Sequence, residues 1–243
     1  MELMVLGRFG PFPRPGGACS GYLVESGGTH LLCDLGSGTL SRLLDGFCLA
    51  QLDAVILSHL HFDHFSDMLV LQYALEASEK QGKRLHPLIV YAPDTPEAHR
   101  ALLRSKYFDV RSIRDGMCVR IGSLCVTFRA VWHPVEAYAA DIVDDNGKRL
   151  FYTGDTGWFD ALVEYAAGAD TLLADTAFLA EQDHGGSLPH LTTKQVGQLA
   201  REAGVKQLLC THLYGMGTTD EQVEKEIDFV PSFVIKEQRH SQI

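Results

Sequence analysis

Residues His59-Leu60-His61-Phe62-Asp63-His64 place three histidines and an aspartate within six consecutive positions. Imidazole nitrogens and carboxylate oxygens are ligands that zinc and similar divalent cations prefer in proteins. A solvated polar loop, or core histidines hydrogen-bonded to the backbone, would be the ordinary structural explanation for such residues one at a time. A run this dense is rare by chance, so the pattern predicts a metal site.

The segments on either side of this run predict a rigid support for it. Residues 53–57 are apolar and rich in branched side chains, which is typical of a buried strand. Residues 65–81 carry apolar side chains at helical spacing and predict a helix. The run therefore follows the carboxyl end of a strand, where α/β folds usually place their chemistry.

The composition is that of a globular chain, with 46% hydrophobic and 21% charged residues among 243. The formal net charge of −10 disfavours a broad nucleic-acid surface, which needs lysines and arginines clustered on one face. The most basic stretch, residues 100–114, also contains acid and predicts a solvated helix and connector. No apolar run reaches transmembrane length and no signal peptide is evident, so we expect a cytoplasmic protein.

The six cysteines form no Cys-x-x-Cys pair. Cys33, Cys125 and Cys210 fall within apolar, strand-like runs, so we expect them to pack as small hydrophobic side chains. Their spacing indicates no disulfide framework, which agrees with a reducing compartment.

Strands and helices alternate along the rest of the chain. The expected strands are residues 3–6, 20–25, 29–34, 53–57, 87–91, 118–121, 124–131, 137–143, 149–153, 171–174, 207–211 and 233–236. The expected helices are residues 37–45, 65–81, 95–105, 159–167, 192–202 and 220–226. Asp144-Asp145-Asn146-Gly147 predicts a tight hairpin turn, because Asn-Gly readily adopts positive φ. With no repeat or linker, residues 1–243 are expected to form one domain of two similar halves, with sheets packed together and helices outside.

Three further residues share the context of the first cluster. His133, Asp155 and His212 each follow an apolar strand, and Gly154 lets the backbone bend before Asp155. With the four polar residues of the first run, they make seven candidate ligands, too many for one tetrahedral zinc. Two divalent cations a few ångströms apart, sharing one carboxylate, accommodate seven ligands. Zn²⁺ is the expected metal, with Mn²⁺ and Fe²⁺ as alternatives.

At these residues the chain resembles the metallo-β-lactamase fold hydrolases. The resemblance rests on the His-x-His-x-Asp-His run, His133, Gly154-Asp155-Thr156 and Thr211-His212, and it covers nearly the whole chain. It implies an α/β fold, a four-layer αβ/βα sandwich of two mixed β-sheets packed face to face with helices outside. It also implies a division of the ligands: His59, His61 and His133 for one metal, Asp63, His64 and His212 for the other, and Asp155 as the bridge.

Residue types separate the branches of this family. The commonest dizinc β-lactamases carry a cysteine where Asp155 stands, and flavodiiron oxidoreductases carry an acid where His61 stands. These two differences disfavour a β-lactam substrate and a redox iron site. Glyoxalase II-type thioesterases add a C-terminal helical region, for which little chain remains after His212. Pro189-His190-Leu191-Thr192 instead resembles an element of ribonuclease Z-like phosphodiesterases. That resemblance implies that His190 reaches the scissile phosphate from the side opposite the metals.

A histidine in that position has a chemical role, since it can stabilise negative charge and protonate a leaving alkoxide near neutral pH. The structural alternative is that His190 merely precedes a helix whose N-cap is Thr192 or Thr193. Ribonuclease Z has a basic tRNA-binding arm that no stretch here can form, and its His-Glu-Ala-Thr segment is replaced by Ala174-Asp175-Thr176-Ala177. The chain therefore looks more similar to compact relatives without the arm, including cyclic-nucleotide and phosphoribosyl cyclic phosphodiesterases.

The sequence thus predicts a metal-dependent hydrolase, a dizinc phosphodiesterase in which a hydroxide bridging the metals attacks phosphorus. Asp63 is expected to be both a ligand and a catalytic residue that takes the proton of the attacking water, and His190 to assist the departing oxygen. The expected substrate is a small phosphodiester or cyclic phosphate, without extended nucleic acid or membrane, and a homodimer stays open. His184, in the 180–190 loop, is a candidate substrate contact.

Three other functions stay open. A thioester or lactone hydrolase would use the same nucleophile on a carbonyl carbon. A nuclease of the ribonuclease Z type would act on single-stranded ends. A non-catalytic metal-binding module is the third, although degenerate scaffolds tend to lose ligands that are all present here.

Overall fold

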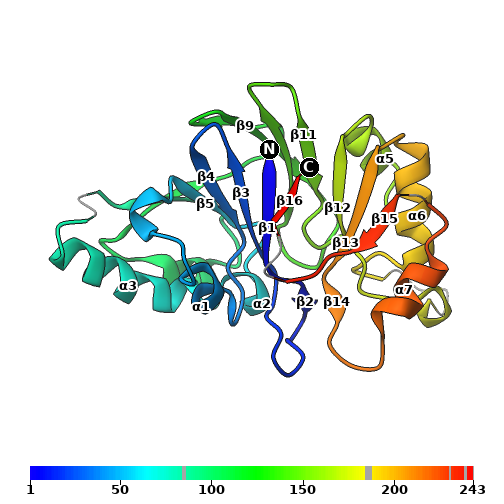
Figure 1. Cartoon of the computed structure of the whole chain (residues 1–243), viewed down its shortest axis with the longest axis horizontal. Coiled ribbons are helices and arrows are strands. Elements are labelled where there is room, and N and C mark those ends of the chain that lie inside the picture. Colours follow the sequence, from blue (N-terminus) through cyan, green and yellow to red (C-terminus); the bar gives the residue numbers. More distant parts are fainter. Residues whose placement is uncertain (84–85, 184–187, 230, 238–239, 243) are drawn as a thin grey trace.

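Two seven-stranded sheets form the centre of the computed structural model, which describes residues 1–83, 86–183, 188–229, 231–237 and 240–242 (Figure 1). In spatial order the first sheet contains β16 (His240–Gln242), β1 (Glu2–Gly7), β3 (Gly21–Ser26), β4 (Thr29–Cys33), β5 (Ala54–Ile56), β6 (Leu88–Ala92) and β7 (Phe108–Ser112). The second contains β15 (Ser232–Val234), β13 (Gln207–Thr211), β12 (Thr171–Asp175), β11 (Arg149–Tyr152), β10 (Tyr138–Asp144), β9 (Leu124–Ala130) and β8 (Cys118–Ile121). A separate pair joins β14 (Leu213–Tyr214) to β2 (Phe9–Gly10).

Helices cover the outer face of each sheet. The α-helices are α1 (Thr39–Leu43), α2 (Phe62–Phe65), α3 (Met68–Lys80), α4 (Glu97–Arg100), α5 (Ala161–Ala166), α6 (Thr193–Glu202) and α7 (Asp220–Glu226). The 3₁₀ segments are η1 (Leu49–Gln51), η2 (Ala101–Leu103) and η3 (Ala180–Gln182). Figure 1 shows α1 and α3 on one side of the two sheets and α5, α6 and α7 on the other. None of the described helices is long and apolar enough to cross a bilayer.

Three apolar clusters fill the spaces between these four layers. The cluster between the sheets takes side chains from both, such as Tyr22 of β3 and Val126 of β9. A second cluster lies between the first sheet and α1 and α3, and a third lies between the second sheet and α5, α6 and α7. Central parallel strands such as β5 and β12 are buried on both faces, which explains why their sequences are continuously apolar.

The direction of the strands decides where their ends meet. In the first sheet β4, β5, β6 and β7 are parallel, and in the second sheet β11, β12, β13 and β15 are parallel. Strand β9 has the same direction as β11, because each is antiparallel to β10 between them. The carboxyl ends of β9, β11, β12 and β13 therefore share one edge of the second sheet, where functional loops are expected.

Most of the predicted elements are present, and the exceptions have local causes. Residues 100–114 were expected to be a helix and connector. Their first residues are helical, as the end of α4 and as η2, but the expected connector contains strand β7, so that part of the prediction was wrong. The strand alternates buried Phe108 with exposed Asp109 and exposed Arg111, because β7 is an edge strand with one face in solvent.

The predicted helix at residues 65–81 is divided into α2, which begins earlier, and α3. The division comes from the loop after β4. The amide of Leu35 donates to the carbonyl of His64 and the carbonyl of Leu35 accepts from the amide of Asp67, at 2.7 and 3.1 Å. These bonds hold the first turn, which carries Asp63 and His64, against the first sheet.

Two local predictions are confirmed. Gly147 has φ +77° in the turn between β10 and β11, and its amide donates to the Asp144 carbonyl. Thr192 is the N-cap of α6, and its hydroxyl accepts from the amide of Gln195.

The prediction that three cysteines pack as small hydrophobic side chains is correct for Cys33 and Cys210, which are buried, but wrong for Cys125, which is only half-buried.

Candidate metal centre

The seven predicted ligands lie past the ends of strands from both sheets and come together at one edge of the molecule. Those that follow β5 are His59 and His61 in the loop and Asp63 and His64 in α2. Those from the second sheet are His133 after β9, Asp155 after β11 and His212 after β13. They form two groups that could each hold a metal ion: His59, His61 and His133; and Asp63, His64, Asp155 and His212.

The first group consists of three imidazoles. His61 Nδ1 lies 3.0 Å from His59 Nε2 and 3.1 Å from His133 Nε2. Two nitrogens bound at about 2.0–2.1 Å to one tetrahedral zinc lie roughly 3.3 Å apart, so this spacing fits a shared cation. Burial lowers the pKa of His59 and His61, and lowers that of His133 to about 4, so all three present neutral lone pairs.

The second group combines two imidazoles with two carboxylates. Asp155 Oδ2 lies 3.2 Å from both His64 Nε2 and His212 Nε2, and Asp63 Oδ2 lies 3.2 Å from His212 Nε2. Burial would lower the pKa of His64 and His212, but Asp155 and the other carboxylates around them together outweigh it and raise both well above the ordinary value. The field that favours protonated imidazole here would equally favour a metal cation.

Asp155 lies between the two groups. Its Oδ2 is also 3.6 Å from His59 Nε2 of the first group, and the carboxylate is almost completely buried. A carboxylate in that position is suited to bridge two cations, as the resemblance to metallo-β-lactamase fold hydrolases implies.

An orphaned atom supports the fit of a metal to this donor set. His64 Nε2 is buried and makes no hydrogen bond, although acidic oxygens surround it. Its other nitrogen, Nδ1, lies 2.8 Å from Asp34 Oδ2. A ring held by one nitrogen, with the other directed at carboxylates, is the arrangement of a metal-binding histidine.

Asp34 is a residue that the sequence analysis missed. It lies directly after β4, is fully buried and has φ +59°. Its carboxylate accepts hydrogen bonds from the amide and hydroxyl of Ser58 and from the hydroxyl of Tyr152, at 2.6–2.8 Å. Its position in the sequence could have identified it, because Asp34 follows an apolar strand, as the predicted ligands do.

His190 lies beside the second group. Its ring stacks on that of His212 with centroids 5.0 Å apart, and its Nδ1 is 3.8 Å from Asp155 Oδ2. A stronger contact links Nδ1 to Asp175 Oδ2 at 2.8 Å. Burial would lower the pKa of His190, but the Asp175 carboxylate raises it above the ordinary value and so favours the proton-donating form.

Asp175 is the second residue that the sequence analysis left without a role. It is the last residue of β12, fully buried, and its Oδ1 lies 3.6 Å from His212 Nδ1. Asp155, Asp175, His190 and His212 form a further group of close donor atoms. Asp175 could also have been identified from the sequence, because it is an acidic residue at the end of an apolar strand.

A family model described as Beta-lactamase superfamily domain matches residues 35–213, which include all seven predicted ligands and His190. The chain belongs to the metallo-β-lactamase superfamily of hydrolases. It is 36% identical over 221 residues to the probable metallo-hydrolase YhfI of Bacillus subtilis, covering 90% of each chain. The crystal structure of YhfI aligns with this chain over 99% of this chain and 98% of the YhfI chain, with 33% identity and a TM-score of 0.92. The predicted fold is thereby confirmed.

Two further relatives carry more specific names. The chain is 26% identical over 272 residues to ribonuclease Z of Archaeoglobus fulgidus, covering 87% of each. It is 29% identical over 244 residues to the zinc phosphodiesterase ELAC protein 2 of Macaca fascicularis, covering 87% of this chain and 29% of that one.

Near the candidate metal centre, the backbone of Gly10 lies unusually close to the side chain of a proposed ligand, His212. A Cβ on Gly10 of β2 would lie 1.9 Å from His212 Nε2. His212 itself has φ +53°, which is rare for a residue other than glycine. The backbone of β2 therefore limits where the His212 ring can lie.

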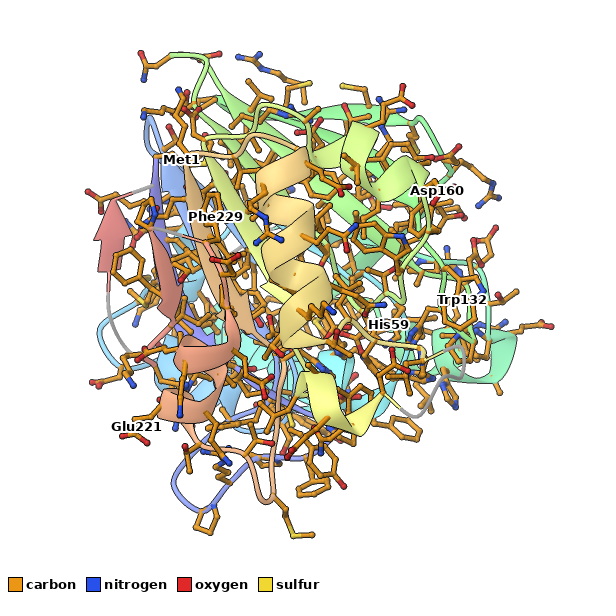
Figure 2. All side chains as sticks on the ribbon, turned by 90° about the vertical axis from the view of Figure 1, so that its right-hand side faces the viewer. Met1, His59, Trp132, Asp160, Glu221 and Phe229 are labelled. Atoms are coloured by element: carbon orange, nitrogen blue, oxygen red, sulfur yellow. The ribbon has the colours of Figure 1, made fainter. Side chains whose placement is uncertain are left out.

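Aromatic side chains lie near His190. The Phe178 ring lies 5.8 Å from that of His190, and the Tyr214 ring lies 6.5 Å from Phe178. Figure 2 labels the exposed Trp132, which precedes His133, to the right of His59 in that view. His184, the predicted substrate contact, lies outside the described residues.

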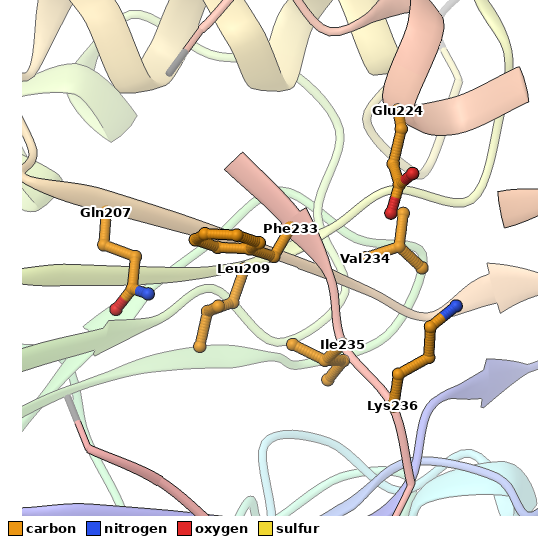
Figure 3. A pocket seen from close by; sticks show the side chains of 7 residues that line it. All are labelled: Gln207, Leu209, Glu224, Phe233, Val234, Ile235 and Lys236. Atoms are coloured by element: carbon orange, nitrogen blue, oxygen red, sulfur yellow. The ribbon is translucent and has the colours of Figure 1, made fainter. Parts of the chain in front are cut away.

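A separate pocket of about 340 Å³ lies beside β13 and β15 (Figure 3). It is lined by Gln207, Leu209, Glu224, Phe233, Val234, Ile235 and Lys236. None of the predicted ligands lines it, and its charged residues are a single acid and a single base. It is therefore not part of the candidate metal centre.

Proposed function

We propose that this hydrolase is a dizinc phosphodiesterase acting on small phosphodiesters or cyclic phosphates. The observation that carries the proposal is the pair of His190 and Asp175, which stands beside the second ligand group without completing it. The names of the ribonuclease Z and zinc phosphodiesterase relatives support the same chemistry.

The donor set favours zinc over magnesium or calcium, because five of the seven proposed ligands are imidazoles. Two bound cations would supply an ionised water and offset negative charge on the substrate. Asp155 would hold the two groups at a constant separation. Asp63, whose carboxylate faces His212, would serve as ligand and as acceptor of the proton from the attacking water.

His190 would act on the leaving group. Its Nδ1 is engaged by Asp175, which leaves Nε2 as the nitrogen available to a substrate oxygen. An alkoxide is strongly basic and needs a proton as the P–O bond breaks, whereas p-nitrophenolate leaves readily without one. The proposal therefore predicts that the role of His190 depends on the leaving group.

The test compares two substrates with the metal-loaded protein. His190→Ala should lower kcat on an alkyl phosphodiester by about 10²–10⁴-fold and lower it much less on bis-p-nitrophenyl phosphate, with the metal content unchanged. Asp175→Asn should show the same dependence on leaving group with a smaller loss, because the imidazole remains. His30→Ala, a half-buried histidine of β4, is the matched control and should leave both rates unchanged.

Several outcomes would contradict the proposal. Full activity of His190→Ala on every phosphodiester, or loss of metal from it, would remove His190 from the catalytic machinery. Equal losses on both substrates would exclude leaving-group protonation as its role. Hydrolysis of thioesters or lactones by the parent protein, with no hydrolysis of phosphodiesters, would replace the proposed activity.

Charge supports the choice of a small substrate. With a formal net charge of −10, the protein lacks the excess of basic residues that drives counterion release from nucleic acid. We expect precursor tRNA to bind weakly at physiological salt in a filter or mobility-shift assay. Processing of precursor tRNA as fast as the best small substrate would show that the substrate is an extended RNA.

A further inference from the structure

Two cysteines contact each other on the surface hairpin formed by β8 and β9. Cys118 begins β8 and Cys125 is the second residue of β9. Their sulfur atoms lie 2.8 Å apart. Unbonded carbon atoms rest at about 3.5–4.0 Å, so these larger atoms are already in close contact. A disulfide bond of about 2.05 Å would need only a small further movement.

The hairpin places both sulfurs on the same face. Cys118 lies opposite Thr127 and Cys125 opposite Arg120, so the two cysteines are diagonal neighbours across the strand pair. The alternate residues Leu124 and Val126 enter the cluster between the sheets. The cysteines therefore point to the outer face of the second sheet, where Cys118 is exposed and Cys125 half-buried.

The register of this hairpin is held by the other sheet. Its turn consists of Gly122 and Ser123, between the ends of β8 and β9. The Ser123 hydroxyl donates to the Ser26 carbonyl at 2.6 Å, and the Ser123 amide donates to the Thr29 hydroxyl at 2.8 Å. Because the turn is tied to β3 and β4, sliding of the strands that would separate the sulfurs is opposed.

We infer that Cys118 and Cys125 form a reversible disulfide, made by exchange with a low-molecular-weight disulfide such as oxidised glutathione. The exposed Cys118 sulfur attacks one sulfur of the small disulfide as a thiolate and releases one small thiol. The Cys125 sulfur then attacks Cys118 in the mixed disulfide, forms the protein disulfide and releases the second small thiol. Two protein thiols and one small disulfide become one protein disulfide and two small thiols.

The order of attack follows from the environments of the two sulfurs. The hydrogen bond to Cys118, followed by burial, raises the pKa of Cys125 to about 11. Cys125 therefore keeps its proton more firmly and is the poorer first nucleophile, whereas its contact with the Cys118 sulfur places it for the second step. The exposure of Cys118 suits it to the first step.

The other cysteines provide internal controls. Cys19, Cys33 and Cys210 are buried, whereas Cys48 is exposed at the beginning of η1. Of the six thiols measured after denaturation, oxidised glutathione should therefore remove those of Cys118 and Cys125, and in addition only that of Cys48. Cys48 is expected to carry at most a glutathione adduct.

The experiment uses the full-length protein, reduced and then treated with oxidised glutathione. Trypsin cuts after Arg114, Arg120 and Arg129, so it separates the two cysteines into the peptides 115–120 and 121–129. We expect these peptides to appear in the mass spectrum as one linked species that separates on reduction. Cys125→Ser should instead accumulate a glutathione adduct on Cys118, and Cys48→Ser should behave as the parent protein.

Two results would overturn the inference. One is the absence of the linked peptides at concentrations of oxidised glutathione that modify Cys48. The other is a lasting glutathione adduct on Cys118 of the parent protein, which would mean that Cys125 cannot reach it. Both readouts are independent of the metals and of the proposed phosphodiesterase activity.

Discussion

Individual acidic residues in this protein have different roles according to what surrounds them. Asp34 and Asp175 are fully buried, and their carboxylates contact Nδ1 of His64 and Nδ1 of His190, respectively. Asp155 instead contacts histidines of both ligand groups. The first two orient imidazoles, as outer carboxylates do in metalloproteins, whereas Asp155 is placed to contact the metals themselves.

Replacement of Asp155 tests this distinction. Asp155→Ala should lower the metal content, because no other carboxylate of the described residues contacts histidines of both ligand groups. Removal of a residue that only hydrogen-bonds a metal ligand typically lowers metal affinity by about 10–100-fold, and we expect Asp155→Ala to lower it by more. Elemental analysis of the purified variant measures it. The exposed Asp160, which precedes α5, provides the control Asp160→Ala. Retention of two metals by Asp155→Ala would contradict the bridging role.

At the scale of secondary-structure elements, the short strand β2 has an effect beyond its length. It pairs with β14, which directly follows His212, and the Arg8 carbonyl accepts from the Leu213 amide at 2.9 Å. This pairing brings the backbone of Gly10 against the imidazole of His212. Only glycine allows that approach, since any side chain would occupy the space of the ring.

The substitution Gly10→Ala should therefore displace His212. Its Cβ would lie 1.9 Å from Nε2 and 2.1 Å from Cε1, so the ring or the strand must shift. We expect the second metal to be lost while the three histidines of the first group keep theirs, so elemental analysis should find about one metal per chain. Gly16→Ala, in the loop after β2, has open space around the new Cβ but a φ of +76°, so it should lower stability through backbone strain and still keep both metals. Two tightly bound metals in Gly10→Ala would show that the site tolerates the shift.

At the scale of the whole molecule, the proposed metals connect the two sheets. The ligands before residue 65 follow a strand of the first sheet, and the later three follow strands of the second. A cation bound in each group would join segments more than seventy residues apart, such as His61 and His133. Metal binding should then stabilise the packing of one sheet on the other.

Removal of the metals should lower the melting temperature. A site filled at a hundredfold excess over its Kd contributes about 2.7 kcal/mol to the free energy of unfolding. For a chain of this size that corresponds to a fall in Tm of roughly 5–10 °C for each site. Differential scanning calorimetry before and after a chelator, and after zinc is restored, measures the effect. The chelator should change the Tm of Asp155→Ala much less, and an unchanged Tm for the parent protein would exclude a structural contribution.

The sequence by itself determined the chemistry of the site and the type of fold. The dense run from His59 to His64 and the later His133, Asp155 and His212 could be recognised because each follows an apolar strand, and strand ends of one direction meet at one edge. The buried strands β5, β12 and β13 were predictable for a related reason, since burial on both faces requires continuous apolar sequence.

Only the tertiary structure decided which further residues act on those ligands. Asp34 contacts Tyr152, and Asp175 contacts His190, through pairings that no local periodicity encodes. The edge strand β7 carries charges on its solvent face and so lacks the apolar signal of a buried strand. Cys118 and Cys125 meet because of the register of a hairpin that the first sheet holds in place. Sequence patterns report burial and periodicity, whereas contacts between distant residues depend on how the two sheets pack.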